Sequence, residues 1–352
     1  MSVQPYERSD DYMVLDERKN QILDLVISEY ISTGEPVGSK TLIEKSKINV
    51  SSATIRSEML ELEKMGLLCK PHTSAGRIPS QKGLKQFAEK SINRYSLTED
   101  DLHILVPAVK ASVGLIEAIK DASVRLAEFS GCAVFTASPL SEDGKFTFEV
   151  TPAGKKAIAI MAVSSSGAVK SVFTKVDREI TANDAQKLTN ILNSAFAGFP
   201  VNEINGVRVM LFKDEVSKNI PELNCVIVPV VDLVQSIKSY ELCISGSSNL
   251  LSYPEFANIE TAKEYLQLLD RREDIIDELL QTSDSGIDIK IGDDSHLLKT
   301  TPAGIVSAKI SNRIPIVIGV LGPARMNYSK IIAGCKHVIL QLRERTDGDD
   351  EI

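Results

Sequence analysis

The chain has 352 residues, of which 43% are hydrophobic and 25% charged, a composition typical of globular proteins. No run approaches the roughly 20 apolar residues that a membrane-spanning helix needs. The first residues, MSVQPYERSDDYM, lack the apolar core of a secretory signal. We therefore expect a cytoplasmic protein that contacts no membrane.

Charge is distributed unevenly along the chain. The whole sequence carries a net charge of −8, yet residues 40–94 hold 11 Lys and Arg against 5 Asp and Glu, which gives that segment +6 and leaves −14 on the rest. A basic segment on an acidic protein indicates that one face meets a polyanion. An ordinary solvated surface can carry the same charge, so local sequence patterns have to show whether this segment binds a polyanion.

The cysteines and histidines form no metal-binding or redox pattern. Five cysteines and four histidines are scattered along the chain, and none stands in a CxxC, HxxxH or HExxH spacing. This arrangement favours buried thiols and isolated imidazoles over a disulfide framework or a structural zinc site. We expect no metal and no cofactor.

Two helices joined by a turn are predicted near the N-terminus. Asp16 is placed to cap the first helix, and Gly34 ends it, with Pro36 close behind. Ser39 then precedes a short helix, KTLIEKS. Apolar residues recur at helical spacing within the first helix, namely Ile22, Leu23, Val26, Ile27, Tyr30 and Ile31.

A third helix is predicted to begin at Ser51 or Ser52. At 100° per residue, Ile55, Met59 and Leu62 form one buried stripe. Leu60 lies off this stripe, and we expect it to pack against the following strand. The far side and its flanks carry mostly small or polar residues, which are Ala53, Thr54, Arg56, Ser57 and Lys64.

Small side chains at the start of a helix can approach a DNA groove closely. The free N–H groups of the first turn favour an anion such as phosphate. Thr54 can offer a methyl group to thymine, and Arg56 can bind a guanine edge or a phosphate oxygen. The simpler alternative is that SSAT is only a good cap followed by weak helix formers. A short helix, a turn and a second helix with a small polar start is, however, typical of a helix-turn-helix.

A basic loop comes after this helix. Leu67 and Leu68 begin an extended segment, Pro71 and Gly76 bound a turn-rich tip, and Ser80 caps the next helix. Such a loop is typical of the wing of a winged helix, which sets basic side chains against the DNA backbone or minor groove. The candidate DNA-binding residues are Ser39, Lys40, Ser51, Ser52, Thr54, Arg56, Ser57, His72, Ser74 and Arg77.

The rest of the chain alternates helices and strands. The amphipathic stretch from Glu99 to Phe129 predicts one long helix that joins the N-terminal part rigidly to the next domain. Strands are expected at 131–138, 157–163 and 169–176, the last two joined by an SSSG turn, and a helix at 182–196.

The C-terminal pattern continues in the same manner. We expect helices at 223–237, 261–280 and 324–345, strands at 240–244, 286–292, 304–310 and 315–322, and a disordered acidic end, DGDDEI. This order predicts an α+β fold with a largely antiparallel sheet.

No group of residues assembles a nucleophile, a base and an orienting residue. GSSN at 246–249 is not GxSxG, and no histidine supports it nearby. GPARM at 322–326 could bind phosphate at a helix start with help from Arg325, but it lacks the GxGxxG and Walker patterns. A tight strand-to-helix turn is the favoured interpretation, and we expect that the chain is not an enzyme.

Seven phrases of the sequence resemble the heat-inducible transcription repressor HrcA family. They are GEPVGSKTL at 34–42, SSATIR at 51–56, LEKMGLL at 62–68, PHTSAGRIPSQKG at 71–83, ISGSSNLLSYPEF at 244–256, IGDD at 291–294 and IGVLGPARMNYSKI at 318–331. PHTSAGRIP is the specific signature, whereas TIR alone also occurs in other bacterial repressors. The resemblance covers about residues 15–342.

The resemblance implies a domain organisation. It indicates a winged-helix DNA-binding domain at 1–95 and a discontinuous GAF-like domain at 96–198 and 259–345. A dimerisation domain inserted at 199–258 and a disordered tail at 346–352 complete the expected order.

The resemblance also implies a function. HrcA proteins bind an inverted-repeat operator called CIRCE upstream of chaperone operons, lose repression on heat shock, and are thought to need chaperonin for their active form. A homodimer fits this expectation, because a single winged helix reads few base pairs and two symmetric copies read an inverted repeat. The alternative is a regulator whose GAF-like domain senses a small metabolite; an enzyme with an appended DNA module and an adapter that binds protein are further rivals.

Overall fold

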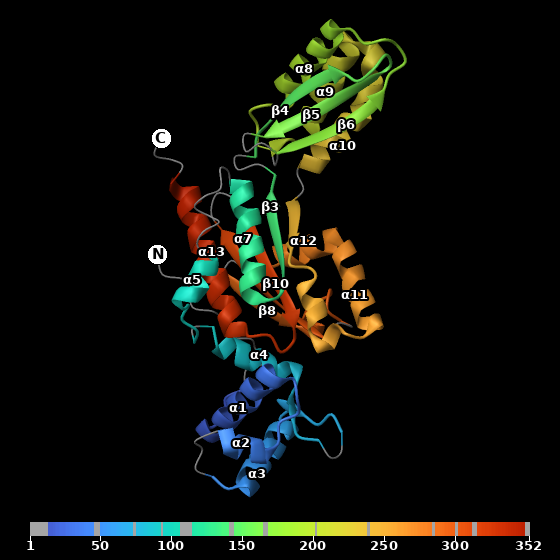
Figure 1. The fold of residues 1–352 in the computed structure, drawn as a ribbon. Helices are drawn as coiled ribbons and strands as arrows, with labels where there is room; N and C mark the ends of the chain where they lie inside the picture. Colours follow the sequence, from blue (N-terminus) through green and yellow to red (C-terminus); the bar gives the residue numbers. More distant parts are fainter. Residues whose placement is uncertain are drawn as a thin grey trace.

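The structure is a computed structural model, and three units succeed one another along its long axis (Figure 1). An N-terminal unit lies at one end, a unit built on a five-stranded sheet lies in the centre, and a unit with a three-stranded sheet lies at the other end. The structure describes residues 13–45, 50–72, 75–92, 94–105, 115–140, 144–164, 168–200, 203–237, 240–283, 286–299, 302–311 and 315–348.

The N-terminal unit consists of four helices and a two-stranded sheet. The helices are α1 (Glu17–Thr33), α2 (Ser39–Lys45), α3 (Ser52–Lys64) and α4 (Gln81–Lys90), and the strands are β1 (Leu68–Cys69) and β2 (Ile78–Pro79). Asp16, Ser51 and Ser80 cap α1, α3 and α4 by accepting hydrogen bonds from backbone N–H groups. Gly34 ends α1 in the left-handed conformation at φ 73°. These caps confirm the predicted helix boundaries.

The core of the N-terminal unit joins α1 to α3. Ile55, Met59 and Leu62 of α3 are buried, as the helical spacing predicts, against the buried side of α1. The expectation for Leu60 is wrong, because its side chain is 45% exposed. One residue further along a helix is rotated by about 100°, which carries Leu60 away from the face that Met59 buries.

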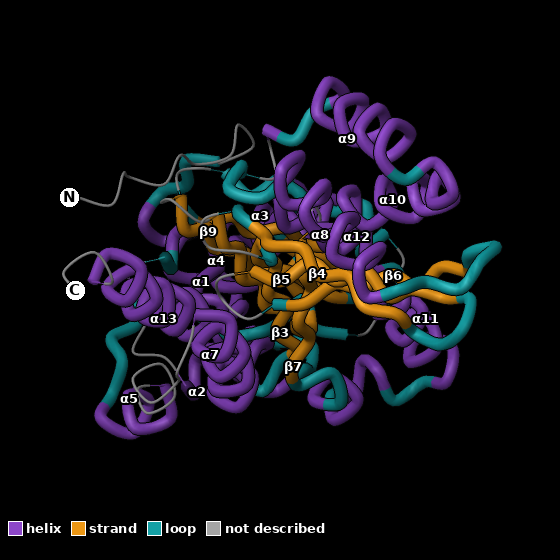
Figure 2. Tube along the Cα trace, turned by 90° about the horizontal axis from the view of Figure 1, so that it is seen from above, coloured by secondary structure: helices purple, strands orange, loops and turns teal. Residues whose placement is uncertain are grey.

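The central unit is an antiparallel sheet between two layers of helices. Its strand order is β7-β3-β10-β9-β8. Helices α7 and α13 pack on one face with α5 beside them, while α12 packs on the other face beside α11 (Figure 2). The strands are β3 (Ala133–Pro139), β7 (Tyr240–Ser245), β8 (Ile287–Ile291), β9 (Ala303–Ser311) and β10 (Pro315–Pro323); the helices are α5 (Glu99–Leu105), α7 (Leu115–Ser130), α11 (Ile259–Asp270), α12 (Arg272–Leu280) and α13 (Tyr328–Gly348). Short 3-10 helices lie at η3 (Asn249–Ser252), η4 (Pro254–Phe256) and η5 (Gly292–Asp294).

Two long helices expected in this unit are each divided. Helices α5 and α7 contact one another side by side, so residues 99–105 and 115–129 do not lie on one rod. Residues 106–114 lie outside the described part of the chain. The helix expected at 261–280 breaks at Arg271, whose backbone leaves the helical region at φ −83° and ψ 62°. Amphipathic spacing continues across both breaks, which is why the sequence pattern does not reveal them.

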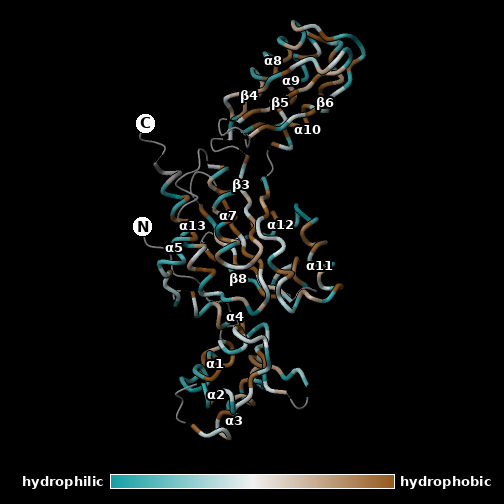
Figure 3. Tube along the Cα trace, in the orientation of Figure 1, coloured by the Kyte–Doolittle hydropathy of each residue, from teal (hydrophilic) through white to brown (hydrophobic). Residues whose placement is uncertain are grey.

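The third unit is inserted between β3 and β7. Its strands β4 (Phe146–Pro152), β5 (Ala157–Ser164) and β6 (Val169–Lys175) pair antiparallel in the order β4-β5-β6. Helices α8 (Ala182–Phe196), α9 (Gly206–Asn219) and α10 (Ile227–Ile237) and the 3-10 helix η2 (Pro221–Val226) complete it. The unit has its own hydrophobic core. In it the ring centroid of Phe196 lies 5.8 Å from that of Phe148 and 5.3 Å from that of Phe212. Hydrophobic residues thus occur in all three units (Figure 3).

The inserted unit differs from the expected insertion at 199–258. Its core runs from Leu140 to Ile237, and the strands that flank it pair directly, with Pro139 opposite Tyr240. The expected hairpin of β5 and β6 is confirmed, but it pairs with β4, a strand that the sequence pattern did not indicate, and not with β3. The alternation of apolar and polar residues predicts that a segment is a strand, but it does not indicate which sheet the strand joins. This accounts for the difference between the expected and the observed insertion. Residues 240–258 lie in the central unit, in β7, η3 and η4.

The direct pairing of β3 with β7 predicts that the insertion can be removed. Replacing residues 140–239 by an Asn-Gly turn should leave a β3–β7 hairpin, because Pro139 and Tyr240 already face each other. Circular dichroism and thermal unfolding should show a folded, cooperative shortened chain. Loss of cooperative unfolding would mean that the central sheet depends on the insertion.

Candidate nucleic-acid interface

The first turn of α3 lies at the end of the N-terminal unit that points away from the central unit (Figure 1). The Ser51 hydroxyl accepts from the Thr54 backbone N–H at 3.1 Å and lies 2.9 Å from the Thr54 hydroxyl. Ser51, Arg56 and Ser57 are exposed, while Ser52 and Thr54 are half-buried. The cap therefore orders a polar, solvent-facing helix start.

Ser39 has a different position from the other candidates. Its side chain is buried and lies 3.1 Å from the Ser52 hydroxyl, which joins the first turns of α2 and α3. Lys40, the next residue, is exposed. The structure thus brings Lys40 to the same end of the unit as α3 and places Ser39 beneath it as a support.

Arg77 is also engaged within the protein. Its guanidinium binds the Glu63 carboxylate of α3, with Nη2 and Nε at 2.7 and 2.9 Å from Oε2. Its backbone exchanges two 2.9 Å hydrogen bonds with Val37. Gly76 makes this approach possible, because a Cβ there would lie 2.4 Å from the Val37 carbonyl oxygen. Arg77 therefore fastens the loop to α3 and to the segment before α2.

The tip of this loop is only partly described. His72 is exposed, and its carbonyl accepts from the Ala75 N–H at 3.0 Å. Ser74 lies outside the described residues. Sequence reasoning missed Glu63 and Val37 as supports of the loop, and 14 positions along the chain separate Glu63 from Arg77. A sequence offers no local signal for such a pair.

The two ends of α3 differ in charge. Glu58 and Glu61 lie 3.2 and 3.0 Å from the Lys19 ammonium group, and Glu63 is bound by Arg77. These ion pairs offset the negative charge of the later turns. Among the described residues, Lys40 and Arg56 have no such ion-pair partner. Lys64 and Lys70 are exposed in the same way, so positive charge lies on either side of these carboxylates, and free N–H groups add to it at the first turn of α3.

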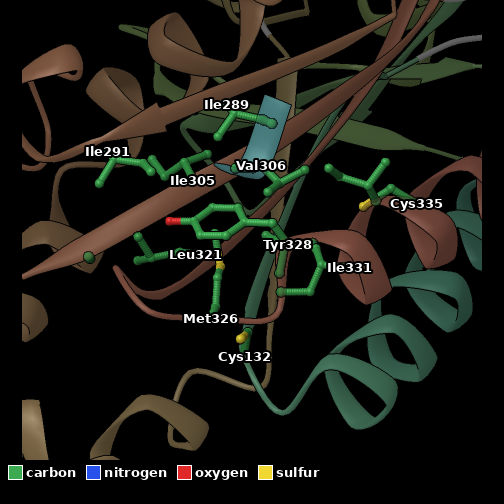
Figure 4. Close-up of a cluster of buried hydrophobic side chains, with 14 of the residues drawn as sticks. Cys132, Ile289, Ile291, Ile305, Val306, Leu321, Met326, Tyr328, Ile331 and Cys335 are labelled. Carbon is green, nitrogen blue, oxygen red and sulfur yellow. The ribbon is translucent and has the colours of Figure 1, made fainter. Parts of the chain in front are cut away.

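The core of the central unit differs from the polar start of α3. Around Tyr328 the interior is filled with apolar and sulfur-containing side chains (Figure 4). Burial raises the pKa of the Cys132 thiol to about 11 and that of Cys335 to about 12, which makes both poor nucleophiles at neutral pH. The Tyr328 hydroxyl donates to the Ala324 carbonyl at 2.7 Å.

The described residues give two further findings. No group of three or more His, Cys, Asp or Glu side chains among them is placed to hold a metal ion. No helix in the described ranges is long and apolar enough to cross a membrane.

The chain is similar to a set of named repressors. Residues 117–332 match the family described as HrcA protein C terminal domain. The Heat-inducible transcription repressor HrcA of Acetivibrio thermocellus is 31% identical, with 95% of this chain and 97% of the relative covered. The protein of the same name from Clostridium acetobutylicum is also 31% identical, with 95% and 98% covered. These relatives define a class, the heat-inducible transcription repressors.

Within that class the chain belongs to the HrcA family. A solved structure described as a hypothetical protein has the same fold over 95% of this chain and 99% of its own, with a TM-score of 0.62 and 22% sequence identity. That likeness concerns the fold alone.

The contacts of Arg77 predict a stability effect that Arg56 should not share. Arg77→Ala should lower the free energy of unfolding by about 1–3 kcal/mol, because it leaves a partly buried Glu63 without its partner. Arg56→Ala, on the exposed side of α3, is the matched control and should change it little. Denaturant unfolding measures both, and equal stabilities would contradict a supporting role for Arg77.

Proposed function

We propose that this chain is a dimeric repressor that binds an inverted-repeat operator of the CIRCE type and controls chaperone operons. The observation that carries the proposal is the capped, polar first turn of α3 at the free end of the N-terminal unit, followed directly by the exposed Arg56. The proposal makes this unit a winged helix, with α3 as the recognition helix and residues 70–77 as the wing. The central unit is then the GAF-like domain, and no catalytic role is assigned to it.

The proposed contacts are chosen by the exposure of each side chain. Thr54, Arg56 and Ser57 would face base edges in the major groove, with Ser51 and Ser52 at phosphates near the helix start. The wing would bring His72 and Ser74 to the backbone or minor groove, and Lys40 would bind phosphate. Ser39 and Arg77 would act through the side chains that they hold in place.

A second copy is needed to read both halves of an inverted repeat. The three-stranded sheet of the inserted unit offers a surface for it. One sheet face is buried beneath α8 and α10, and the other, which we call the open face, carries exposed Val169 and Phe173 beside half-buried Met161 and Val163. Val163 pairs with Val169 and Ala159 with Phe173, so these side chains are neighbours. We assign the open face to the homodimer.

The proposed regulation joins the repressor to the state of the cell's chaperones. Chaperonin would keep the repressor in its DNA-binding form in the cytoplasm, and heat would release the operon. Electrophoretic mobility of an inverted-repeat chaperone operator, with and without chaperonin and before and after heating, tests this. Full operator binding after heating without chaperonin would refute the proposed regulation by chaperonin and heat. Equal binding to the operator and to random duplex would refute the whole proposal.

Arg56 provides the sharpest test of the DNA contact. Arg56→Ala should weaken operator binding by roughly 1–3 kcal/mol if its guanidinium reads a base, and affect random duplex much less. Arg125→Ala, which changes a half-buried arginine of the central unit, is the control and should bind like the parent chain. Equal losses on both duplexes would make Arg56 a phosphate contact.

The open face gives a test of the dimer. Phe173→Glu should shift the protein from dimer to monomer in sedimentation, because a charge would be buried against the second copy. Met210→Glu is the matched control, since Met210 is 65% exposed on α9 of the same unit, away from the sheet. Dissociation by Met210→Glu alone would move the interface to α9.

A further inference from the structure

Three polar contacts between described residues join the N-terminal and central units. Arg325, in the turn between β10 and α13, donates from Nη1 to the Ile31 carbonyl of α1 at 3.0 Å. Lys85 of α4 forms a 2.9 Å ion pair with Asp294 of η5. Lys336 of α13 donates to the Ile92 carbonyl at 3.2 Å. The contacts therefore hold the end of α1, the side of α4 and the segment after α4.

Arg325 is more enclosed than Lys85, whose side chain is 27% exposed. The Arg325 side chain is 14% exposed, and it binds the Glu255 carboxylate as well as Ile31, with Nη2 at 3.3 Å from Oε2 and Nε on Oε1. The fork of a guanidinium can reach a carboxylate and a carbonyl together, which a lysine ammonium cannot reproduce. The cation also lies at the C-terminal end of α1, where the helix carbonyls carry partial negative charge.

The chain around Arg325 is shaped to admit it. Gly34 ends α1 at φ 73°, and a Cβ at this position would lie 3.3 Å from the Arg325 Nε. Near the Lys85–Asp294 ion pair, the Gln81 side chain lies directly over Gly292. A Cβ at Gly292 would lie 2.2 Å from the Gln81 Nε2 atom. Both glycines thus let the units approach closely, and apolar residues of both belong to one continuous core.

These contacts leave the first turn of α3 free. The turn lies at the far end of the N-terminal unit, and the central unit meets the opposite side through α1 and α4 (Figure 1). The interface therefore does not mask the DNA-binding surface. What it determines is the angle at which the N-terminal unit stands on the central unit.

Small changes in this angle would move α3 appreciably. Helix α1 has 17 residues and a length of about 25 Å at 1.5 Å per residue. A rotation of roughly 15° about its end at Arg325 would displace the other end by about 7 Å, close to the rise of two base pairs at 3.4 Å each. Lys19 at that other end forms ion pairs with Glu58 and Glu61, so α3 moves with it. Dimers of this kind read half-sites at a fixed separation, so such a displacement would matter.

We propose that Arg325 is a positioning residue for operator binding, which fixes through Ile31 and Glu255 the separation of the two recognition helices in the dimer. This inference rests on the proposed function. A loosened unit samples many orientations, which lowers the effective concentration of the second recognition helix once the first is bound. The residue thereby determines which half-site spacing is preferred.

The test compares spacings of the operator with the full-length protein. Duplexes carry the inverted repeat at its natural half-site separation or with two base pairs added or removed, and a random duplex accompanies them. Arg325→Ala should lose roughly tenfold in affinity at the natural spacing and less than about twofold on the other duplexes, which flattens the spacing profile. The affinity of Arg325→Lys at the natural spacing should lie between those of the parent protein and Arg325→Ala. Arg125→Ala should keep the spacing profile of the parent protein.

A second variant removes another contact from the central unit. Asp294→Ala frees Lys85 and should flatten the profile in the same direction, even where Arg325→Ala fails to fold. A parent-like profile in both variants would overturn the proposal, as would an equal loss on every duplex or dissociation of the dimer in sedimentation. A parent protein that ignores the inverted repeat would instead refute the proposed function, whatever the variants do.

Discussion

The burial of one side of α3 is the constraint on which the DNA-binding surface depends. Ile55, Met59 and Leu62 pack against α1, and their removal from water stabilises the pair by about 1.5–3 kcal/mol for each side chain. A helix that buries these three positions has no freedom to turn about its axis. Successive residues of a helix are rotated by about 100°, so Arg56 and Ser57 face solvent once these three positions are buried.

The last turns of α3 complete this arrangement through charge. Glu58, Glu61 and Glu63 would repel a phosphate backbone if they stood alone, but Lys19 and Arg77 offset them within the unit. The start of the same helix is therefore polar and lacks carboxylates, and the carboxylates of its later turns are paired within the unit. The Glu63–Arg77 pair also fixes where the basic loop leaves the unit, so packing and electrostatics place the loop together.

Sequence signals predicted the features that local physics decides. The cap Ser51, the left-handed Gly34 and the buried stripe of α3 all stand where the sequence predicts them. Ser39 and Arg77 were expected to face DNA, but they contact Ser52 and Glu63, partners 13 and 14 residues away, and no local pattern shows the direction of those side chains. The limits of the inserted unit were missed for the same reason, because only pairing decides whether β5 and β6 extend β3 or form a sheet with β4.

The division of charge gives the three units different relations to DNA. The basic excess of +6 lies within residues 40–94, whereas the remainder of the chain carries −14. Within that remainder, residues 1–39 hold 3 Lys and Arg against 8 Asp and Glu (−5), residues 140–239 hold 11 against 11 (0), and residues 95–139 and 240–352 carry −9. A polyanion therefore attracts the surface formed by residues 40–94 and repels the central unit, within a range of about 10 Å at 0.1 M salt. An approach with the start of α3 foremost follows from this distribution, and it leaves the inserted unit at the end of the molecule away from the duplex (Figure 1).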